Sequence, residues 1–235
     1  MPSPARSSSK KSSTSKKRRP DRKASHIAFF PVLVLIFIMW MLYRSIFTFP
    51  VWFDESIGKL LFFAVPIWLF VTMTGHKGVV ESFAPTKARR GLLLGIAAGG
   101  LFGFVASILS FVSTGAMIEA VPIFTAPNFW GEFVLAMMTG FFETLLFYSF
   151  AMTLILEKYP RWSLLRQSLT IALIFLVFHI PNALLRFELP SMSGVFLLLF
   201  LFALGQAYLF AARKNAYAIV LTHAIWGMVL LVYGW

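Results

Sequence analysis

Three ionisable side chains stand inside long apolar runs of the sequence. Glu143 lies at the middle of one run, whereas the other eight acidic residues fall in the expected tails, loops or helix ends; His179 and His223 lie inside two later runs. A charged side chain at the centre of a bilayer costs about 2.5–3.5 kcal/mol on insertion scales, so such residues usually face a partner or a functional cavity. A carboxylate and two imidazoles are typical proton acceptors and donors in hydrolysis. We expect the three side chains to meet in one polar site.

The composition identifies the class of protein that carries them. Of the 235 residues, 59% are hydrophobic and 13% are charged, whereas soluble globular proteins are about 45–50% apolar and 25% charged. Apolar runs of about 20 residues are long enough to cross a bilayer as helices. We therefore predict an all-α, polytopic transmembrane helical bundle. Because the chain has no cysteine, disulfides, thiolate metal ligands and a cysteine nucleophile are excluded.

The net charge of +12 is concentrated at the N-terminus. Nine of the 21 Lys and Arg residues fall within the Ser-rich segment 1–25. A low-complexity basic tail of this kind is typical of disorder. Because it directly precedes an apolar run, we expect it to bind anionic lipid headgroups, and we expect no nucleic-acid partner.

The apolar runs and the basic residues between them predict about seven spans with a defined orientation. Eighteen Lys and Arg lie on the side of the N-terminal tail, and Arg44, Lys59 and Arg186 lie on the other side. By the positive-inside rule the N-terminus is cytoplasmic and the C-terminus is outside. This interpretation puts Asp54 and Glu55 in a short loop and Lys59 near the outer interface. The expected spans are 27–49, 57–74, 91–113, 129–156, 163–180, 189–212 and 216–234.

Short motifs accompany the three ionisable residues. Glu143–Tyr148 (ETLLFY) resembles the pattern EExxxR, Phe175–His179 (FLVFH) matches FxxxH, and His223–Gly227 (HAIWG) resembles HxxxN. In this order the motifs resemble those of the CPBP family, which includes CAAX prenyl endopeptidases and bacteriocin-processing or immunity proteins, and the similarity covers about residues 125–235. The resemblance implies an intramembrane endopeptidase in which Glu143 and His179 activate water and His223 helps to bind the oxyanion.

The sequence departs from the family motifs at three positions: Thr144 replaces a glutamate, Tyr148 replaces the arginine, and Gly227 replaces the asparagine. Thr144 and Tyr148 are separated by one helical turn, so these two changes together remove an ion pair and leave neither charge unpaired. The change at Gly227 removes a possible oxyanion donor, and loss of such a donor lowers the rate about 10²–10³-fold in comparable sites. The candidate substitutes for it are Asn182, Gln206 and Thr222.

These observations divide the chain into a disordered basic cytoplasmic tail (1–25), three accessory transmembrane spans (26–124) and a CPBP-like core of four spans (125–235). The third accessory span is glycine-rich and therefore suited to close helix packing. The leading hypothesis is a glutamate-dependent intramembrane endopeptidase of a bacterial cell membrane, which cleaves a membrane-embedded or membrane-proximal peptide or protein. No cofactor and no metal is expected, since the HExxH spacing of zinc proteases is missing.

Three alternatives remain open at this point. The first is a catalytically impaired scaffold or immunity-type binding protein of the same fold, which the changes at Thr144 and Gly227 favour. The second gives Glu143 a structural role as a protonated carboxyl that joins helices by hydrogen bonds. The third is a proton-coupled transporter that uses Glu143, although the broken-helix repeat pairs typical of such proteins are lacking.

Overall fold

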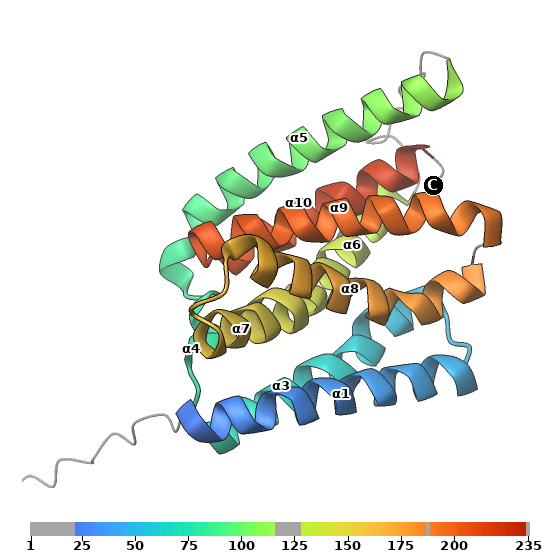
Figure 1. Ribbon diagram of the computed structural model, residues 1–235. Coiled ribbons are helices and arrows are strands. Elements are labelled where there is room, and N and C mark those ends of the chain that lie inside the picture. The colour runs from blue at the N-terminus through green and yellow to red at the C-terminus, as the bar shows by residue number, and fades with distance from the viewer. Residues whose placement is uncertain (1–21, 116–127, 187–188, 234–235) are drawn as a thin grey trace, which may run out of the picture.

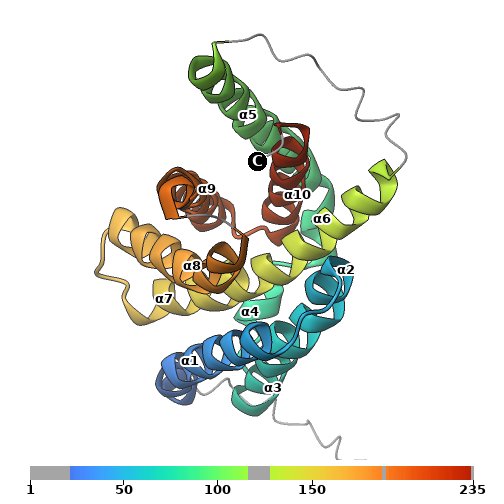
Figure 2. The same cartoon turned by 90° about the vertical axis from the view of Figure 1, so that its right-hand side faces the viewer.

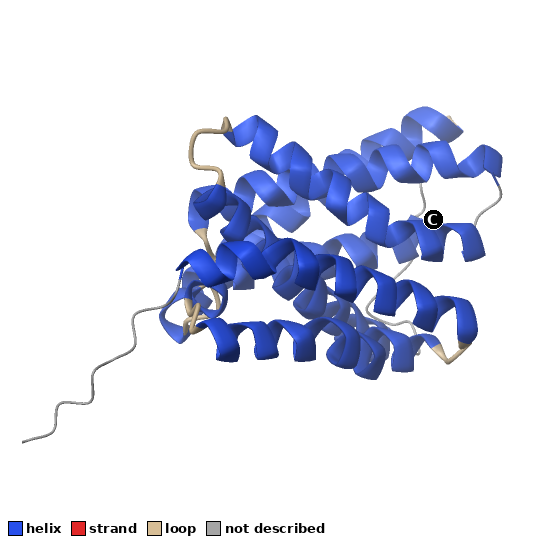
Figure 3. Cartoon of the chain, turned by 60° about the horizontal axis from the view of Figure 1, so that its bottom comes forward, coloured by secondary structure: helices blue, strands red, loops and turns tan. Residues whose placement is uncertain are grey.

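The computed structural model describes residues 22–115, 128–186 and 189–233, and within these ranges the chain is helical with short connections and no strand (Figure 3). Six described segments are long and apolar enough to cross a membrane, and Ala216–Val229 is a shorter apolar helix. The prediction of an all-α, multi-pass membrane protein is thus confirmed. The six segments are Lys23–Ile46, Val51–Thr74, Gly78–Ile108, Phe129–Lys158, Leu164–Pro181 and Phe196–Arg213.

Several spans consist of more than one helical element, because short π-helical and 3₁₀ stretches interrupt the α-helices. In chain order the described elements are α1 (Arg22–Ile46), α2 (Val51–Phe53), the π-helical η1 (Asp54–Gly58) and η2 (Leu60–Ala64), α3 (Val65–Thr74), α4 (Gly78–Glu81), the 3₁₀ turn η3 (Pro85–Lys87), α5 (Ala88–Thr114), α6 (Phe129–Glu143), the π-helical η5 (Thr144–Met152), α7 (Thr153–Lys158), α8 (Leu164–Arg186), α9 (Leu189–Arg213) and α10 (Ala216–Tyr233).

The rod formed by α6, η5 and α7 is the centre of the bundle. In an apolar stretch of 18 residues from this rod, 56% of the stretch is buried inside the protein. In the corresponding stretches of the other five long spans the buried share is 22–39%. It lies between the layer of α1 and α3 on one side and α5, α9 and α10 on the other, with α8 alongside (Figures 1 and 2). Because this rod carries Glu143, the carboxylate is surrounded by helices rather than by lipid.

The second span begins earlier than the sequence indicated. It starts at Val51 instead of Ile57, directly after Pro50. Asp54 and Glu55 therefore belong to the helical span, and their predicted position in a loop is wrong. The Asp54 carboxylate is accommodated there because it accepts a hydrogen bond from the Tyr43 hydroxyl at 2.5 Å and pairs with the Arg44 guanidinium of α1.

Close helix packing depends on glycine between α5 and α10. A Cβ atom at Gly95 would lie 2.9 Å from the Ala218 carbonyl oxygen, and one at Gly99 would lie 2.7 Å from a methyl carbon of Ile225. Neither position has room for a side chain. The glycine-rich third span is therefore a packing surface, as expected, and it holds α10 in place (Figure 1).

The helix that forms the fifth span continues past Pro181, whereas the predicted span ended at Ile180. Pro181 lies inside α8, which extends to Arg186. Proline lacks the N–H that would donate to the carbonyl four residues earlier, which usually kinks or ends a helix. Transmembrane helices tolerate this loss when neighbouring groups satisfy the backbone. The predicted end at Ile180 is therefore wrong for the helix.

Candidate active site

The structure brings together the three ionisable residues singled out in the sequence. Glu143 ends α6 and is 4% exposed. Its Oε2 atom lies 3.6 Å from Nε2 of His179 on α8 and 3.5 Å from Nε2 of His223 on α10. Both distances exceed the usual N–H···O length of about 2.9–3.0 Å. Oε2 has no hydrogen-bond partner among the described residues, so it faces the two imidazoles as an open acceptor.

His179 is held in one orientation by its own helix. Its Nδ1 lies 2.8 Å from the carbonyl oxygen of Phe175, which is an acceptor, and the two rings stack with centroids 4.1 Å apart. In the neutral ring Nδ1 therefore carries the proton and Nε2 presents a lone pair toward Glu143. The two residues of the FxxxH motif thus act together, with Phe175 orienting the imidazole.

His223 reaches Glu143 because α6 and α10 approach closely at Gly140. A Cβ atom at Gly140 would lie 2.8 Å from the Val220 carbonyl oxygen and 3.3 Å from Cβ of His223. The imidazole packs against Phe202, with ring centroids 5.2 Å apart in an edge-to-face arrangement. Packing rather than hydrogen bonding positions this ring, since its buried Nδ1 has no partner among the described residues.

A fourth charged residue, Lys59, completes the site and was placed elsewhere by the sequence interpretation. Its Nζ atom lies 2.5 Å from Glu143 Oε1 and also pairs with Glu55 Oε2. Lys59 is only 2% exposed, so its predicted position near the outer interface is wrong. Glu55, which also accepts a hydrogen bond from the Thr139 hydroxyl at 2.8 Å, joins Glu143 at the site.

Two features of the sequence bear on these ion pairs, although neither identifies Lys59 as the partner of Glu143. Lys59 and Glu55 are one helical turn apart, the spacing of an ion pair on a helix, and a buried carboxylate such as Glu143 requires a compensating charge. What misled the interpretation was the helix boundary. With the span starting at Val51, Lys59 lies about two turns inside it.

Widened helical turns occur on both sides of the ion pair. Lys59 lies between the π-helical segments η1 and η2, and η5 begins at the residue after Glu143. Such turns are rare in proteins and are frequent at functional sites, where they redirect side chains. Here they occur next to both partners of the buried ion pair.

All three positions that depart from the family motifs are neutral, and two of them are buried. Thr144 and Tyr148 are fully buried. The Tyr148 hydroxyl donates a long hydrogen bond of 3.5 Å to the Ala203 carbonyl oxygen, and the Thr144 hydroxyl has no partner among the described residues. At Gly227 a Cβ atom would meet only Cβ of Ala136, at 3.7 Å. The backbone there has room for a side chain, but the sequence supplies none.

The three candidate substitutes for the missing donor differ in availability. The Thr222 hydroxyl donates to the Ala218 carbonyl oxygen of its own helix at 2.7 Å. Gln206 is fully buried, and neither atom of its amide has a partner among the described residues. The side chain of Asn182 lies outside the described residues. Among the described side chains, neither Thr222 nor Gln206 contacts Glu143, whereas Lys59 does.

The site does not have the arrangement of a metal centre in the part of the chain that the structure describes. No group of three or more His, Cys, Asp and Glu side chains is suitably placed for a metal ion there. The ammonium of Lys59 already occupies Oε1 of Glu143, and its positive charge opposes the binding of a second cation at this carboxylate.

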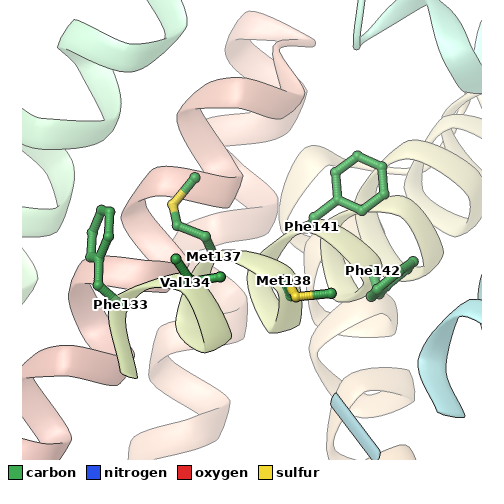
Figure 4. A pocket seen from close by; sticks show the side chains of 6 residues that line it. All are labelled: Phe133, Val134, Met137, Met138, Phe141 and Phe142. Carbon is green, nitrogen blue, oxygen red and sulfur yellow. The ribbon is translucent and has the colours of Figure 1, made fainter. Parts of the chain in front are cut away.

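An apolar pocket of about 270 Å³ lies along α6. Figure 4 shows the side chains that line it, all of which come from this helix. Phe142, which lines one end, directly precedes Glu143. The pocket is lined by Phe133, Val134, Met137, Met138, Phe141 and Phe142.

Comparison with known proteins gives a family match over part of the chain. Residues 125–229 match the family model described as Rce1-like, type II CAAX prenyl endopeptidase Rce1-like. No curated protein and no solved structure matches the chain. The match confirms the resemblance drawn from the three motifs. The matched segment contains Glu143, His179 and His223, whereas Lys59 and Glu55 lie before it.

Proposed function

Because residues 125–229 match the family model described as Rce1-like, type II CAAX prenyl endopeptidase Rce1-like, we propose that this protein is an intramembrane endopeptidase in which Glu143 is the general base. The observation that carries the proposal is the open Oε2 atom of Glu143, which faces Nε2 of both His179 and His223 at 3.5–3.6 Å. At the level of the family, the match supports a CAAX-type intramembrane endopeptidase. The roles of the individual residues rest on the geometry.

The first step is the activation of water. Glu143 Oε2 and the neutral His179 Nε2 are both acceptors, so a water molecule between them donates one hydrogen bond to each. This orientation directs a lone pair of the water oxygen away from both groups and toward a bound peptide carbonyl. Glu143 takes a proton as the new C–O bond forms, and the carbonyl π electrons move to the oxygen, which becomes an oxyanion.

The second step is the breakdown of the tetrahedral intermediate. With its proton on Nε2, His223 donates a hydrogen bond to the oxyanion, which spreads the negative charge. The intermediate collapses, the C–N bond breaks, and the proton held by Glu143 passes to the leaving nitrogen. The products are a carboxylic acid and an amine, so one water molecule is consumed for each peptide bond.

The surroundings of the site suit a substrate that comes from the membrane. The central rod is the most buried of the six long described spans, and the pocket beside Phe142 is lined by apolar side chains. Such a pocket binds hydrocarbon groups. We propose that it holds an apolar part of a membrane-associated peptide or protein next to the scissile bond.

A second candidate function is a binding protein of the same fold. Two observations favour it: Gly227 supplies no oxyanion donor, and Lys59 pairs with one oxygen of the proposed base, Glu143. In that function Glu143 would stabilise the bundle through Lys59, and no peptide bond would be cleaved.

The experiment that separates the two candidates is a comparison of newly formed peptide N-termini in membranes that carry the wild type, Glu143→Gln or His179→Ala. An endopeptidase produces N-termini in wild-type membranes that are missing with both variants, while the abundance of Glu143→Gln equals that of the wild type. Glu157→Gln is the matched control, because Glu157 pairs with His76 outside the site. Identical N-terminal profiles for wild type and Glu143→Gln would support the binding protein instead.

A further inference from the structure

We infer that Lys59 binds the oxyanion of the tetrahedral intermediate and takes the place of the side-chain donor that is missing at Gly227. The inference deepens the proposed endopeptidase function and rests on it. Lys59 comes from the second span, outside the segment that matches the family model, so none of the three motifs includes it. It is the only Lys or Arg of the described residues that pairs with Glu143.

The ammonium has a donor to spare. A lysine Nζ carries three N–H groups. One donates to Glu143 Oε1 at 2.5 Å and a second donates to Glu55 Oε2. No third acceptor contacts Nζ among the described residues. The remaining N–H is thus available to a carbonyl oxygen that enters the site beside Glu143.

The charge that moves during the reaction stays next to Lys59. Before water is activated, the ammonium faces the Glu143 carboxylate. When Glu143 takes the proton it becomes neutral, and the negative charge appears on the carbonyl oxygen of the substrate. If Lys59 interacted only with Glu143, it would oppose the transfer of the proton to Glu143, because it stabilises the charged carboxylate. A lysine that also contacts the oxyanion favours the transition state over the ground state.

Glu55 keeps Lys59 in the site while Glu143 is protonated. Its carboxylate lies one helical turn before Lys59 and is anchored to the central rod by the Thr139 hydroxyl, at 2.8 Å. Thr139 in turn lies one turn before Glu143 on α6. The ammonium therefore retains one charged partner throughout the reaction, which limits the desolvation penalty of a buried cation.

The position of Gly227 explains how a lysine could replace the asparagine. Gly227 lies one turn after His223 on α10 and faces Ala136 of α6. An asparagine there would extend into the interface of α6 and α10, which also contains Glu143 and His223. A donor at either position 227 or position 59 could thus serve the same oxygen, and the chain provides it at 59.

The test uses the full-length protein in proteoliposomes and a peptide that spans a cleavage site identified as above. The variants are Lys59→Gln, Lys59→Arg, Gly227→Asn and the double variant Lys59→Gln/Gly227→Asn. We expect Lys59→Gln to lower kcat about 10²–10³-fold, the usual effect of removing an oxyanion donor, with little change in KM. Lys59→Arg keeps the charge and should stay within about tenfold of the wild type.

The double variant gives the decisive result. If Lys59 supplies the missing donor, Gly227→Asn raises the kcat of Lys59→Gln at least about tenfold. A lysine that only stabilises the fold or only orients Glu143 would not be replaced by an amide on α10. If Lys59→Gln does not fold, the variants with and without Gly227→Asn are compared in a chain that also carries Glu55→Gln. This third substitution removes one of the two carboxylates that lose their cation when Lys59 is replaced.

Three results would overturn the inference. Unchanged kcat in folded Lys59→Gln would show that Lys59 does not contact the oxyanion, and a higher kcat would show that it restrains Glu143 instead. Absence of rescue by Gly227→Asn would assign Lys59 a positioning role. Each of these leaves Glu143-dependent cleavage by the wild type intact. If the wild type itself shows no cleavage that depends on Glu143, the proposed function fails, and the role of Lys59 fails with it.

Discussion

The substitution Gly140→Ala tests how the site is assembled, because it adds one methyl group between two helices without touching an ionisable residue. The new Cβ would lie 2.8 Å from the carbonyl oxygen of Val220 and 3.3 Å from Cβ of His223. Ordinary contacts of a Cβ begin at 3.4 Å. The backbone of α10 would therefore have to move away from α6 by about 0.6 Å, since a carbonyl cannot rotate aside as a side chain can.

The displacement of α10 determines how much Gly140→Ala should lower the stability and kcat. Overpacking of this kind destabilises a protein by about 1–3 kcal/mol. The same displacement moves the imidazole of His223 away from Glu143, from which it is separated by 3.5 Å. A misplacement of about 1 Å can lower a catalysed rate about 10²-fold. We expect kcat of Gly140→Ala to fall about tenfold, with a smaller change in KM.

The assays are thermal unfolding in detergent and kcat on a cleaved peptide, and Gly131→Ala is the matched control. Gly131 lies on the same helix, and a Cβ there has no atom within 4 Å. Alanine is the better helix former by about 1 kcal/mol, so the control should equal or exceed the wild type in stability. Wild-type stability and kcat in Gly140→Ala, or equal losses in both variants, would refute the close approach of α6 and α10 at this site.

Three further predictions concern the buried charges, a buried amide and the orientation in the membrane. Lys59→Met leaves the buried Glu143 and the partly buried Glu55 without their cation and should lower the free energy of unfolding by about 3–5 kcal/mol. Adding Glu55→Gln should restore part of this stability, and equal stability of both variants would contradict the ion pairs of Lys59. Gln206→Met removes an amide without partners and should raise the unfolding temperature; a lower kcat with unchanged folding would instead make Gln206 a donor in the site. A reporter fused after Trp235 should be outside and one inserted in residues 75–90 should be inside; a cytoplasmic C-terminus would show that the number of spans is not odd.

The sequence alone predicted the features that depend on local composition. Apolar runs of a given length must form helices in a bilayer, because every backbone polar group has to be satisfied within the segment. Placing Glu143, His179 and His223 in such runs costs free energy, and this cost led to the prediction that the three side chains meet in one site. Helical periodicity also explains the contact between Phe175 and His179 of the FxxxH motif, since residues four apart share a face of the helix.

Tertiary structure decided which distant groups meet. Lys59 and Glu143 are 84 residues apart, and their pairing depends on where the second span begins and on which face it turns to the central rod. No local pattern contains that information. Likewise, Gly140 is an ordinary small residue in the sequence, and only the approach of α10 makes it necessary for the position of His223. A buried charge can be recognised from its own segment, but its counter-charge is chosen by the packing of the whole bundle.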